Sequence, residues 1–536
     1  MKRRSLCSRT PLLIFGGCGV SGLLTLIYFV SACALAIYGF NILLTAGLYW
    51  RKRKIKSETP PLSDQPRVTV QLPIYNELYV VERLIDAAAA LAWRRDRLQI
   101  QVLDDSDDET TAIARARVEY HRQRGYDIAL IRRADRAGFK AGALAAGLAR
   151  ATGEFVAVFD ADFVPPRDFL KQTIPHLVAQ PNLGLVQTRW GHLNDEYSLL
   201  TRAEALALDG HFVIEQTARH RNDLFFNFNG TAGVWRRACI EDAGGWHGDT
   251  LSEDLDLSYR AQMRGWKFLF LPDVVAPAEL PPQIHAYKRQ QFRWAKGSTQ
   301  VLLKLGAQVL TTPGLALFKR VEGILHLSGY LMNVLMLALL LTLVPLMLLD
   351  ARFPDVMMYF CFAMFGPVVV YALSQRALYR DWQTRFRFFA ILLLLGTGIA
   401  LSNSLAVMEA FARRGNTFRR TPKFRVENES DAWQSKRYAL PLSWDAFAEL
   451  ALAVYALLGA AIAWQQHLVW TLPFLLLYAA SFAFVGGLSL LHSLPARRRG
   501  VALPIFDFPF RAQKIESTRI AQTRSTNRKS AIQNRK

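Results

Sequence analysis

A run of strand-forming apolar residues, Phe155-Val-Ala-Val-Phe159, ends in two acidic residues, Asp160 and Asp162. A nearly continuous apolar strand is buried on both faces of a sheet, so charge is tolerated only where the strand ends. In open α/β sheets this carboxyl edge is where ligand sites form. Two carboxylates there can hold Mg²⁺ or Mn²⁺, which in turn binds phosphate oxygens. The pair alone is a weak indication, because acidic residues also follow strands that bind nothing.

Residues 67–304 alternate between short β-rich runs and helical ones. The predicted strands are 68–72, 99–103, 128–131 and 155–159, and the predicted helices are 77–92, 110–125 and 140–151. Such alternation predicts an α/β domain with a mostly parallel sheet covered by helices. Acidic or polar groups follow three of the strands, at 75–77, 104–105 and 160–162. If these strands are parallel neighbours, the three groups meet at one edge of the sheet.

The second half of this region contains three stretches with the composition of a binding site. Residues 225–233 (FFNFNGTAG) combine aromatic, amide and glycine residues, as in a loop that contacts a polar, ring-shaped ligand. Ser252-Glu-Asp254 precedes a predicted helix, and Ser252 as its N-cap is an alternative explanation for the acidic residues behind it. Gln290-Gln-Phe-Arg293-Trp294 lies in a basic helix, whose charges would equally suit solvent or lipid headgroups.

Long apolar segments surround this domain, and hydrophobic residues make up 51% of the 536. Residues 1–50 contain an apolar run long enough for one span or, with a tight turn, two; we favour one, at 21–50. The cluster Arg51-Lys-Arg-Lys54 begins a polar linker, 51–66, and is expected in the cytoplasm. An interfacial helical region is predicted at 305–330. Further apolar segments, which predict an α-helical transmembrane bundle, lie at 331–349, 357–373, 388–411, 446–464 and 468–491.

Arginines flank the 388–411 segment on both sides, which predicts that both of its ends are cytoplasmic. We therefore expect this segment to be re-entrant or interfacial, with a third crossing as the alternative. Two transmembrane helices are predicted in 331–375 and two more in 446–491. Residues 412–440 are predicted to be a basic cytoplasmic loop, and 496–536 a basic, disordered tail.

The net charge is +21, but the basic residues cluster beside the apolar segments and no nucleic-acid recognition motif occurs. A nucleic-acid partner is therefore not expected. The five cysteines have no paired spacing, which is typical of a reducing compartment. Together these features predict an integral membrane protein with a cytoplasmic catalytic domain. The short loops and the absence of a cleavable signal favour a bacterial inner (plasma) membrane.

The acidic and basic groups together suit sugar transfer from a nucleotide-activated donor. The leaving diphosphate needs a divalent cation and a cationic side chain, because negative charge develops on it. The acceptor hydroxyl must lose a proton, which calls for a carboxylate base within hydrogen-bond reach. A sugar acceptor is best positioned by an aromatic face, which Trp294 could offer.

Four motifs, in their order and spacing, resemble those of the family 2 glycosyltransferases: Asp104-Asp105, Asp160-Ala-Asp162, Ser252-Glu-Asp254 and Gln290-Gln-Phe-Arg293-Trp294. The chain looks most like the cellulose synthase superfamily, in particular the cellulose synthase-like A and C (glucomannan and xyloglucan-backbone synthase) type. Supporting stretches at 71–77, 138–142, 226–233 and 418–424 extend the resemblance over roughly residues 67–425. It implies a GT-A fold and inversion at the anomeric carbon. Ser252 departs from the threonine that the family often has.

The resemblance also implies roles for individual residues. Asp104 or Asp105 would contact the nucleotide base, Lys140 would bind the donor, and Gln290 and Arg293 would bind its pyrophosphate. Asp160 and Asp162 would hold Mg²⁺ or Mn²⁺ on the diphosphate, and Asp254 would be the catalytic base. Trp294 would stack on the acceptor's terminal sugar, with Phe228, Asn229, Gly230 and Thr231 on the acceptor side. Residues 388–411 resemble the family's interfacial helix, and 418–423 lie where cellulose synthases carry a gating loop of different sequence.

The expected function is that of an inverting, processive β-glycan synthase in the lipid bilayer. It would transfer a hexose from a nucleotide-sugar, with UDP-glucose favoured over GDP-mannose, and pass the polymer through its own spans; an export partner is unknown. A lipid acceptor, giving a glycolipid, is the first alternative. A transporter or scaffold with an inactive α/β domain is the second. The central spans carry almost no ionisable residues, which argues against a transport pathway.

Overall fold

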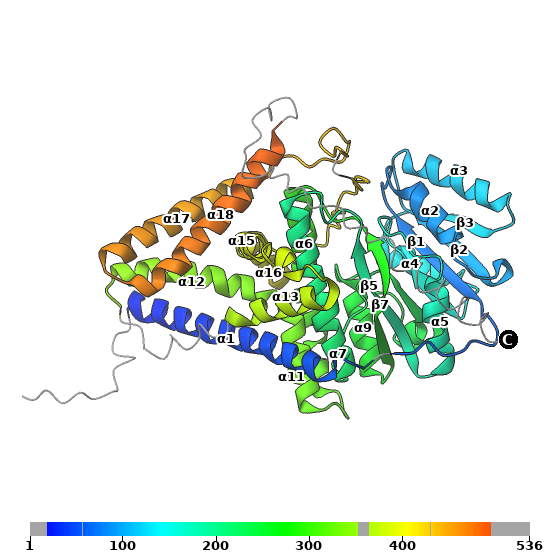
Figure 1. The fold of residues 1–536 in the computed structure, drawn as a ribbon, viewed down its shortest axis with the longest axis horizontal. Coiled ribbons are helices and arrows are strands. Elements are labelled where there is room, and N and C mark those ends of the chain that lie inside the picture. The colour runs from blue at the N-terminus through cyan, green and yellow to red at the C-terminus, as the bar shows by residue number, and fades with distance from the viewer. Residues whose placement is uncertain (1–18, 56, 352–363, 429, 495–536) are drawn as a thin grey trace, which may run out of the picture. The chain divides into compact units, whose positions relative to one another are not determined.

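The computed structural model describes residues 19–55, 57–351, 364–428 and 430–494. Its α/β domain contains a seven-stranded sheet with the order β3-β2-β1-β4-β6-β5-β7 (Figure 1). The strands are β1 (Val68–Ile74), β2 (Leu98–Asp104), β3 (Asp127–Arg132), β4 (Phe155–Val158), β5 (Leu183–His192), β6 (Gly233–Arg236) and β7 (Lys267–Ala278). Pairing between neighbours is parallel except at β6, which is antiparallel to both β4 and β5. The predicted mostly parallel α/β fold is confirmed, although β5, β6 and β7 were not predicted.

The three strands that precede the acidic groups are direct neighbours. β1 lies between β2 and β4 and is parallel to both, with Ile74 opposite Asp104. Their apolar side chains are buried on both faces of the sheet, Ala157 in one core cluster and Val156 in another. Charge is therefore confined to the carboxyl ends of these strands, and the three acidic groups meet at one edge.

Helices cover both faces of the first half of the sheet. α2 (Val81–Ala89), α3 (Thr110–Arg122) and α5 (Phe169–Ala179) pack on one face, and α4 (Phe139–Leu148) packs on the other. α2 begins later than predicted because Asn76 adopts a left-handed conformation, with φ of 56°, and a turn follows it. Asparagine is among the few residues other than glycine that adopt this conformation readily. Here Asn76 Nδ2 donates to Asp107 Oδ1 at 2.7 Å.

A long helix, α10 (Ile284–Thr311), runs close to the start of α9 (Glu253–Met263). Ser252 occupies the predicted N-cap position of α9, and Glu253, Asp254 and Asp256 lie in its first turn, but the Ser252 side chain makes no capping hydrogen bond. A Cβ at Gly297 of α10 would lie 2.2 Å from Ser252 Oγ and 2.9 Å from Ser252 N. Glycine is therefore needed for this close approach, which brings α10 alongside Asp254.

The remaining helices pack around the second half of the sheet and beyond it. They are α6 (Leu199–Asp209), α7 (Thr217–Arg221), α8 (Arg237–Asp242), α11 (Leu317–Leu327), α13 (Phe365–Leu378) and α14 (Trp382–Phe386). The short helix η1 (Arg95–Arg97) instead directly precedes β2, in the first half of the sheet. A π-helix, η2 (Gly210–Gln216), joins α6 to α7. Such π-helical turns are rare and occur frequently at functional sites.

Within the described residues, four helices are long and apolar enough to cross a membrane. They are α1 (Val20–Lys52), α12 (Leu331–Leu348), α17 (Asp445–Gln465) and Val469–Ser493, which comprises η4 (Val469–Thr471) and α18 (Leu472–Ser493). Trp382–Gly398, which comprises α14 and α15 (Phe389–Gly398), passes the same test only together with α16 (Ala400–Phe411), as a pair bent by 42°. Such a pair is a broken span or a re-entrant segment, so the re-entrant helix stays a prediction. The predicted span at 357–373 lies partly, and the tail at 496–536 wholly, outside the described residues.

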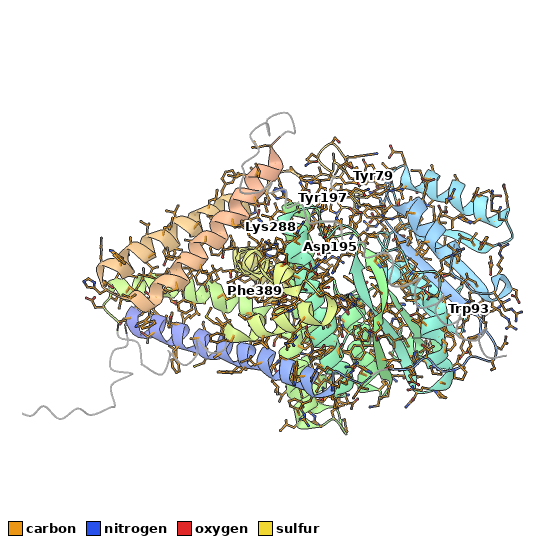
Figure 2. The ribbon with its side chains drawn as sticks, viewed as in Figure 1. Tyr79, Trp93, Asp195, Tyr197, Lys288 and Phe389 are labelled. Carbon is orange, nitrogen blue, oxygen red and sulfur yellow. The ribbon has the colours of Figure 1, made fainter. Side chains whose placement is uncertain are left out.

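Ion pairs connect the α/β domain to the apolar helices. Lys288 of α10 (Figure 2) lies 2.6 Å from both Asp445 Oδ2 and Glu449 Oε1 of α17. On α14, Arg385 NH1 lies 3.1 Å from Asp195 Oδ2. A buried ammonium is costly unless it is paired, so α10 is held against α17. The same helix carries the Gln290–Trp294 motif, and its position is therefore tied to the apolar helices.

Candidate active site

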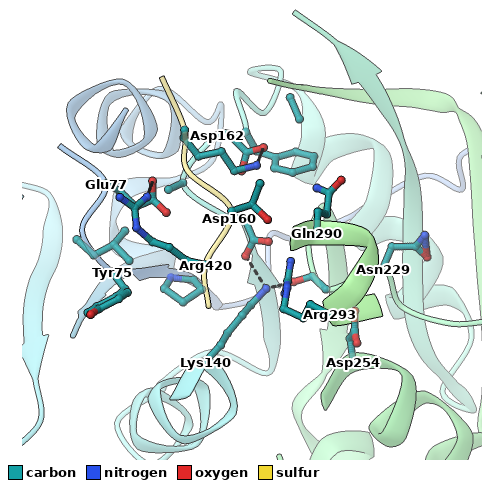
Figure 3. Close-up of a pocket in the computed structure, with 18 of the residues that line it drawn as sticks. Tyr75, Glu77, Lys140, Asp160, Asp162, Asn229, Asp254, Gln290, Arg293 and Arg420 are labelled. Atoms are coloured by element: carbon teal, nitrogen blue, oxygen red, sulfur yellow. Dashed lines mark hydrogen bonds and ion pairs between the residues drawn. The ribbon is translucent and has the colours of Figure 1, made fainter. Parts of the chain in front are cut away.

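The carboxyl edge of β1, β2 and β4 opens into a cavity of about 150 Å³ (Figure 3). Its wall combines the strand ends, α4, the loop before β6, the start of α9, α10 and the segment between α16 and α17. Residues from distant parts of the sequence therefore face one space. The predicted site residues that line it are Asp105, Lys140, Asp160, Asp162, Asn229, Gly230, Asp254, Gln290, Arg293 and Trp294.

Each of the two predicted metal ligands has a lysine partner. Lys140 Nζ lies 2.5 Å from Asp160 Oδ1, and Lys423 Nζ lies 2.6 Å from Asp162 Oδ2. Burial alone would lower the pKa of both lysines, but the neighbouring carboxylates outweigh it and raise both pKa values above the ordinary value. Both side chains are therefore charged and neutralise the two aspartates.

Asp254 and Asp160 lie on different sides of the Lys140 ammonium group (Figure 3). Lys140 Nζ also donates to Gly230 O at 2.9 Å, and a Cβ at Gly230 would lie 2.9 Å from Asp254 Oδ2. Gly230 has φ of 81°, so this position favours glycine for its conformation as well as for the close approach. Burial, reinforced by the charge of Glu253 and opposed by Lys140, raises the pKa of Asp254 to about 7. A carboxyl group with this pKa can exchange a proton near neutral pH.

α10 places polar and aromatic side chains on the opposite wall. The Arg293 guanidinium lies 5.0 Å from the centroid of the Phe418 ring, which stacks on Phe139 with centroids 5.8 Å apart. Arg293 Nε is buried and has no hydrogen-bond partner within the described part of the chain. A guanidinium with a buried, free hydrogen-bond donor suits an anionic ligand such as a diphosphate.

The segment 418–426, between α16 and α17, closes one side of the cavity. Arg420 NH1 lies 3.2 Å from Glu77 Oε2, and the backbone N–H of Phe424 donates to Glu279 Oε1 at 2.9 Å. Burial raises the pKa of Glu77 to about 8, against the opposing charge of Arg420. Two buried carboxyl groups that follow strands therefore hold this segment over the site by hydrogen bonds.

Three predicted site residues do not line the cavity. Asp104 is buried, and its two oxygens accept hydrogen bonds at 2.9 and 2.8 Å from residues of the turn and helix that follow β2. Phe228 is buried in an aromatic core cluster. Thr231 is also buried, but its Oγ1 accepts from Asp160 N at 2.9 Å and so positions that aspartate. Of the neighbouring acidic pair, only Asp105 faces the cavity.

Several cavity residues were not among the predicted site residues, including Tyr75, Arg136, Glu253 and Glu279. The Arg136 guanidinium lies 3.3 Å from the centroid of the Tyr75 ring. Tyr75 and Glu253 belong to motifs that the sequence identifies, so their position could have been inferred. Arg136 lies in a turn, and Glu279 directly follows β7, a strand that was not predicted.

The oxygen ligands at this edge fit Mg²⁺ or Mn²⁺. Asp160 and Asp162 face the same cavity, and such cations are commonly held by one or two carboxylates while substrate phosphates complete the coordination. Across the described ranges, no group of three or more His, Cys, Asp or Glu side chains could hold a metal. A cation held by these two carboxylates would therefore need further oxygen ligands from the phosphates of a bound nucleotide-sugar.

A mostly parallel α/β sheet whose carboxyl edge carries this set of carboxylates and cations defines a GT-A-like glycosyltransferase domain. Residues 66–297 match a family model described as "Glycosyltransferase like family 2", so this domain is similar to the members of that family.

The most similar relatives compared are plant proteins. The chain is 43% identical over 275 residues to the probable glucomannan 4-beta-mannosyltransferase 7 of Oryza sativa subsp. japonica. That alignment covers 51% of this chain and 47% of the relative. It is 41% identical over 300 residues to glucomannan 4-beta-mannosyltransferase 2 of Arabidopsis thaliana, with 53% and 56% covered. The chain spans about half the length of the curated relatives it matches. They lend no support to the predicted bacterial membrane.

Among solved structures, a mannosyltransferase from Pyrobaculum calidifontis in complex with GDP-Man and Mn²⁺ is 24% identical to this chain. The alignment covers 73% of this chain and 100% of that chain, with a TM-score of 0.49.

Proposed function

We propose that this protein is an inverting membrane glycosyltransferase that transfers a hexose from a nucleotide-sugar to a growing β-glycan. One observation carries the proposal: the Lys140 ammonium contacts Asp160 at 2.5 Å, while Asp254 lies on another side of it, beside Gly230. A candidate base and the candidate cation ligands thereby share one cavity. Trp294 on the same cavity wall offers a ring face to an acceptor sugar.

In the proposed reaction, Asp254 takes the proton of the acceptor hydroxyl as the hydroxyl oxygen forms a bond to the anomeric carbon. The bond between that carbon and the donor's phosphate oxygen breaks, and the nucleoside diphosphate leaves with the electron pair. Lys140 and Arg293 stabilise the negative charge that develops on the leaving group. A divalent cation held by Asp160 and Asp162 would supply further positive charge at the same oxygens.

The activities named for the relatives bear on the donor and the acceptor. They are mannosyltransferases of glucomannan, which favours a mannose donor over the UDP-glucose that the sequence analysis favoured. The same names favour a polysaccharide acceptor over a lipid. We place the α/β domain in the cytoplasm, because the basic residues 51–54 stand at the end of α1. Passage of the polymer through the protein's own spans is part of this proposal.

A donor screen tests this function. Full-length protein in detergent is incubated with Mn²⁺ and either labelled GDP-mannose or labelled UDP-glucose, and the product is extracted with organic solvent before linkage analysis. We expect release of nucleoside diphosphate and label in a β-linked polymer that the solvent leaves behind. Extractable label would indicate the glycolipid alternative, and single-sugar products would exclude processive synthesis. If no hexose donor yields nucleoside diphosphate, the proposed function is wrong.

Activity is expected to fall as the pH drops below neutrality. The base must be ionised to accept a proton, and burial raises the pKa of Asp254 to about 7, so its active fraction shrinks as pH falls through that value. We expect kcat/KM, which reports on the free enzyme, to decline about tenfold per pH unit below about pH 7. A kcat/KM independent of pH down to about pH 5 would remove Asp254 from the role of base.

A further inference from the structure

The π-helix η2 presents polar side chains to Asn229, the candidate acceptor residue on the cavity wall. Gln216 Nε2 donates to Asn229 Oδ1 at 2.6 Å, and Asn229 Nδ2 lies 2.9 Å from His211 Nε2. Behind the imidazole, His211 Nδ1 lies 2.9 Å from Glu215 Oε2, and Arg219 Nε donates to Glu215 Oε1 at 3.0 Å. Both polar atoms of the Asn229 side chain are therefore held from one helix.

Only one assignment of hydrogen-bond donors and acceptors fits these contacts. Because Gln216 supplies an N–H group, Asn229 turns its oxygen toward Gln216 and its amino group toward His211. The imidazole must then accept at Nε2 and carry its proton on Nδ1, from which it donates to Glu215. Glu215 lies between His211 Nδ1 and Arg219 Nε, and its two oxygens are placed to accept one hydrogen bond from each. This arrangement is suited to fix that tautomer.

The π-helical geometry is what allows two residues to reach one amide. In an α-helix, residues five apart lie about 140° from one another around the axis. Hydrogen bonding from i to i+5 widens the turn and brings such residues closer to one face. His211 and Gln216 are five apart, and their Nε2 atoms lie 3.4 Å from each other. A regular α-helix here would turn one of them away from Asn229.

The network forms part of the wall of a second cavity, of about 230 Å³, which α1 and α13 also line. His211 and Glu215 remain 27% and 32% exposed at their side chains. Apolar side chains would fill such a place without the desolvation cost of an ionised group. A structural role alone therefore accounts poorly for an imidazole and a carboxylate at this position.

We propose that His211, held in one tautomer by Glu215, is a positioning residue that orients the Asn229 amide toward the acceptor sugar. The inference rests on the proposed function, in which Asn229 lies on the acceptor side. Asn229 adjoins Gly230, whose backbone oxygen accepts from Lys140 and which lies close to Asp254, so a turned amide loses its contact with an acceptor bound there and weakens acceptor binding. None of the side chains proposed to bind the nucleotide-sugar belongs to this network.

The test separates acceptor from donor parameters in His211→Ala, with a manno-oligosaccharide as acceptor. We expect the acceptor KM to rise about tenfold, the effect of losing one well-placed hydrogen bond. The Kd for nucleoside diphosphate and the kcat at saturating acceptor should change less than about twofold. His220→Ala is the matched control, because His220 lies on the adjacent α7, contacts the backbone oxygen of Phe268 at 3.1 Å and stands outside the network. It should leave the acceptor KM unchanged.

A double-mutant cycle with Asn229→Ala completes the experiment. If His211 acts through Asn229, the His211→Ala change should add nothing once Asn229 is alanine. An unchanged acceptor KM in His211→Ala, additive effects in the cycle, or a parallel loss of nucleotide binding would each overturn the inference. Failure of the proposed function would look different, since the unaltered protein would then release no nucleoside diphosphate from any hexose donor.

Discussion

Replacing Asp254 with asparagine is expected to lower turnover by about 10²–10⁴-fold while nucleotide-sugar binding stays within about twofold. The amide has the shape of the carboxylate but cannot take the proton of the acceptor hydroxyl. The donor contacts that we propose, from Lys140, Gln290 and Arg293, remain in place. The measurement is kcat with saturating donor and acceptor, together with the Kd of the nucleotide-sugar by calorimetry.

The control for this substitution is Asp273→Asn, the same chemical change at an exposed position of β7 away from the cavity. It should leave both kcat and Kd unchanged. If Asp254→Asn keeps more than about a tenth of the turnover, another group must accept the proton and the assignment of the base is wrong.

Removing the two carboxylates at the end of β4 is the second change with a large expected effect. In Asp160→Asn combined with Asp162→Asn, Mn²⁺ binding should be lost, because amide oxygens carry no charge to offset cation dehydration. Turnover should fall by about 10²–10³-fold, since a bound cation contributes several kcal/mol of charge stabilisation. Electron paramagnetic resonance of Mn²⁺ with nucleoside diphosphate measures the binding without turnover.

Lys423→Gln is an informative companion variant, because it removes the ammonium group that lies 2.6 Å from Asp162 Oδ2 and leaves the carboxylate in place. We expect Mn²⁺ to bind this variant at least as tightly as the unaltered protein. Unchanged Mn²⁺ affinity in the double asparagine variant would show that the cation is held elsewhere.

Local pattern was sufficient for the first half of the sheet and its acidic edge. Each of the strands that end near Asp105 and Asp160 is a short apolar run that must be buried, so charge could appear only at its end. Periodicity does not reveal the antiparallel β6, because Gly233–Arg236 is only four residues long and pairs with strands far away in sequence. It also cannot separate Asp104 from Asp105. The structure turns Asp104 back onto the following turn and leaves Asp105 to the cavity.

By itself, the sequence determined the α/β class, the apolar helices and the acidic strand ends, since all three follow from where apolar side chains can be buried. Only the tertiary structure decided which cations neutralise those acids. Lys423 stands 261 residues from Asp162 in the chain, and Arg420 stands 343 from Glu77. Contacts at such separations depend on how α10 packs against α16 and on how the segment between α16 and α17 reaches the edge of the sheet, and no local periodicity encodes that packing.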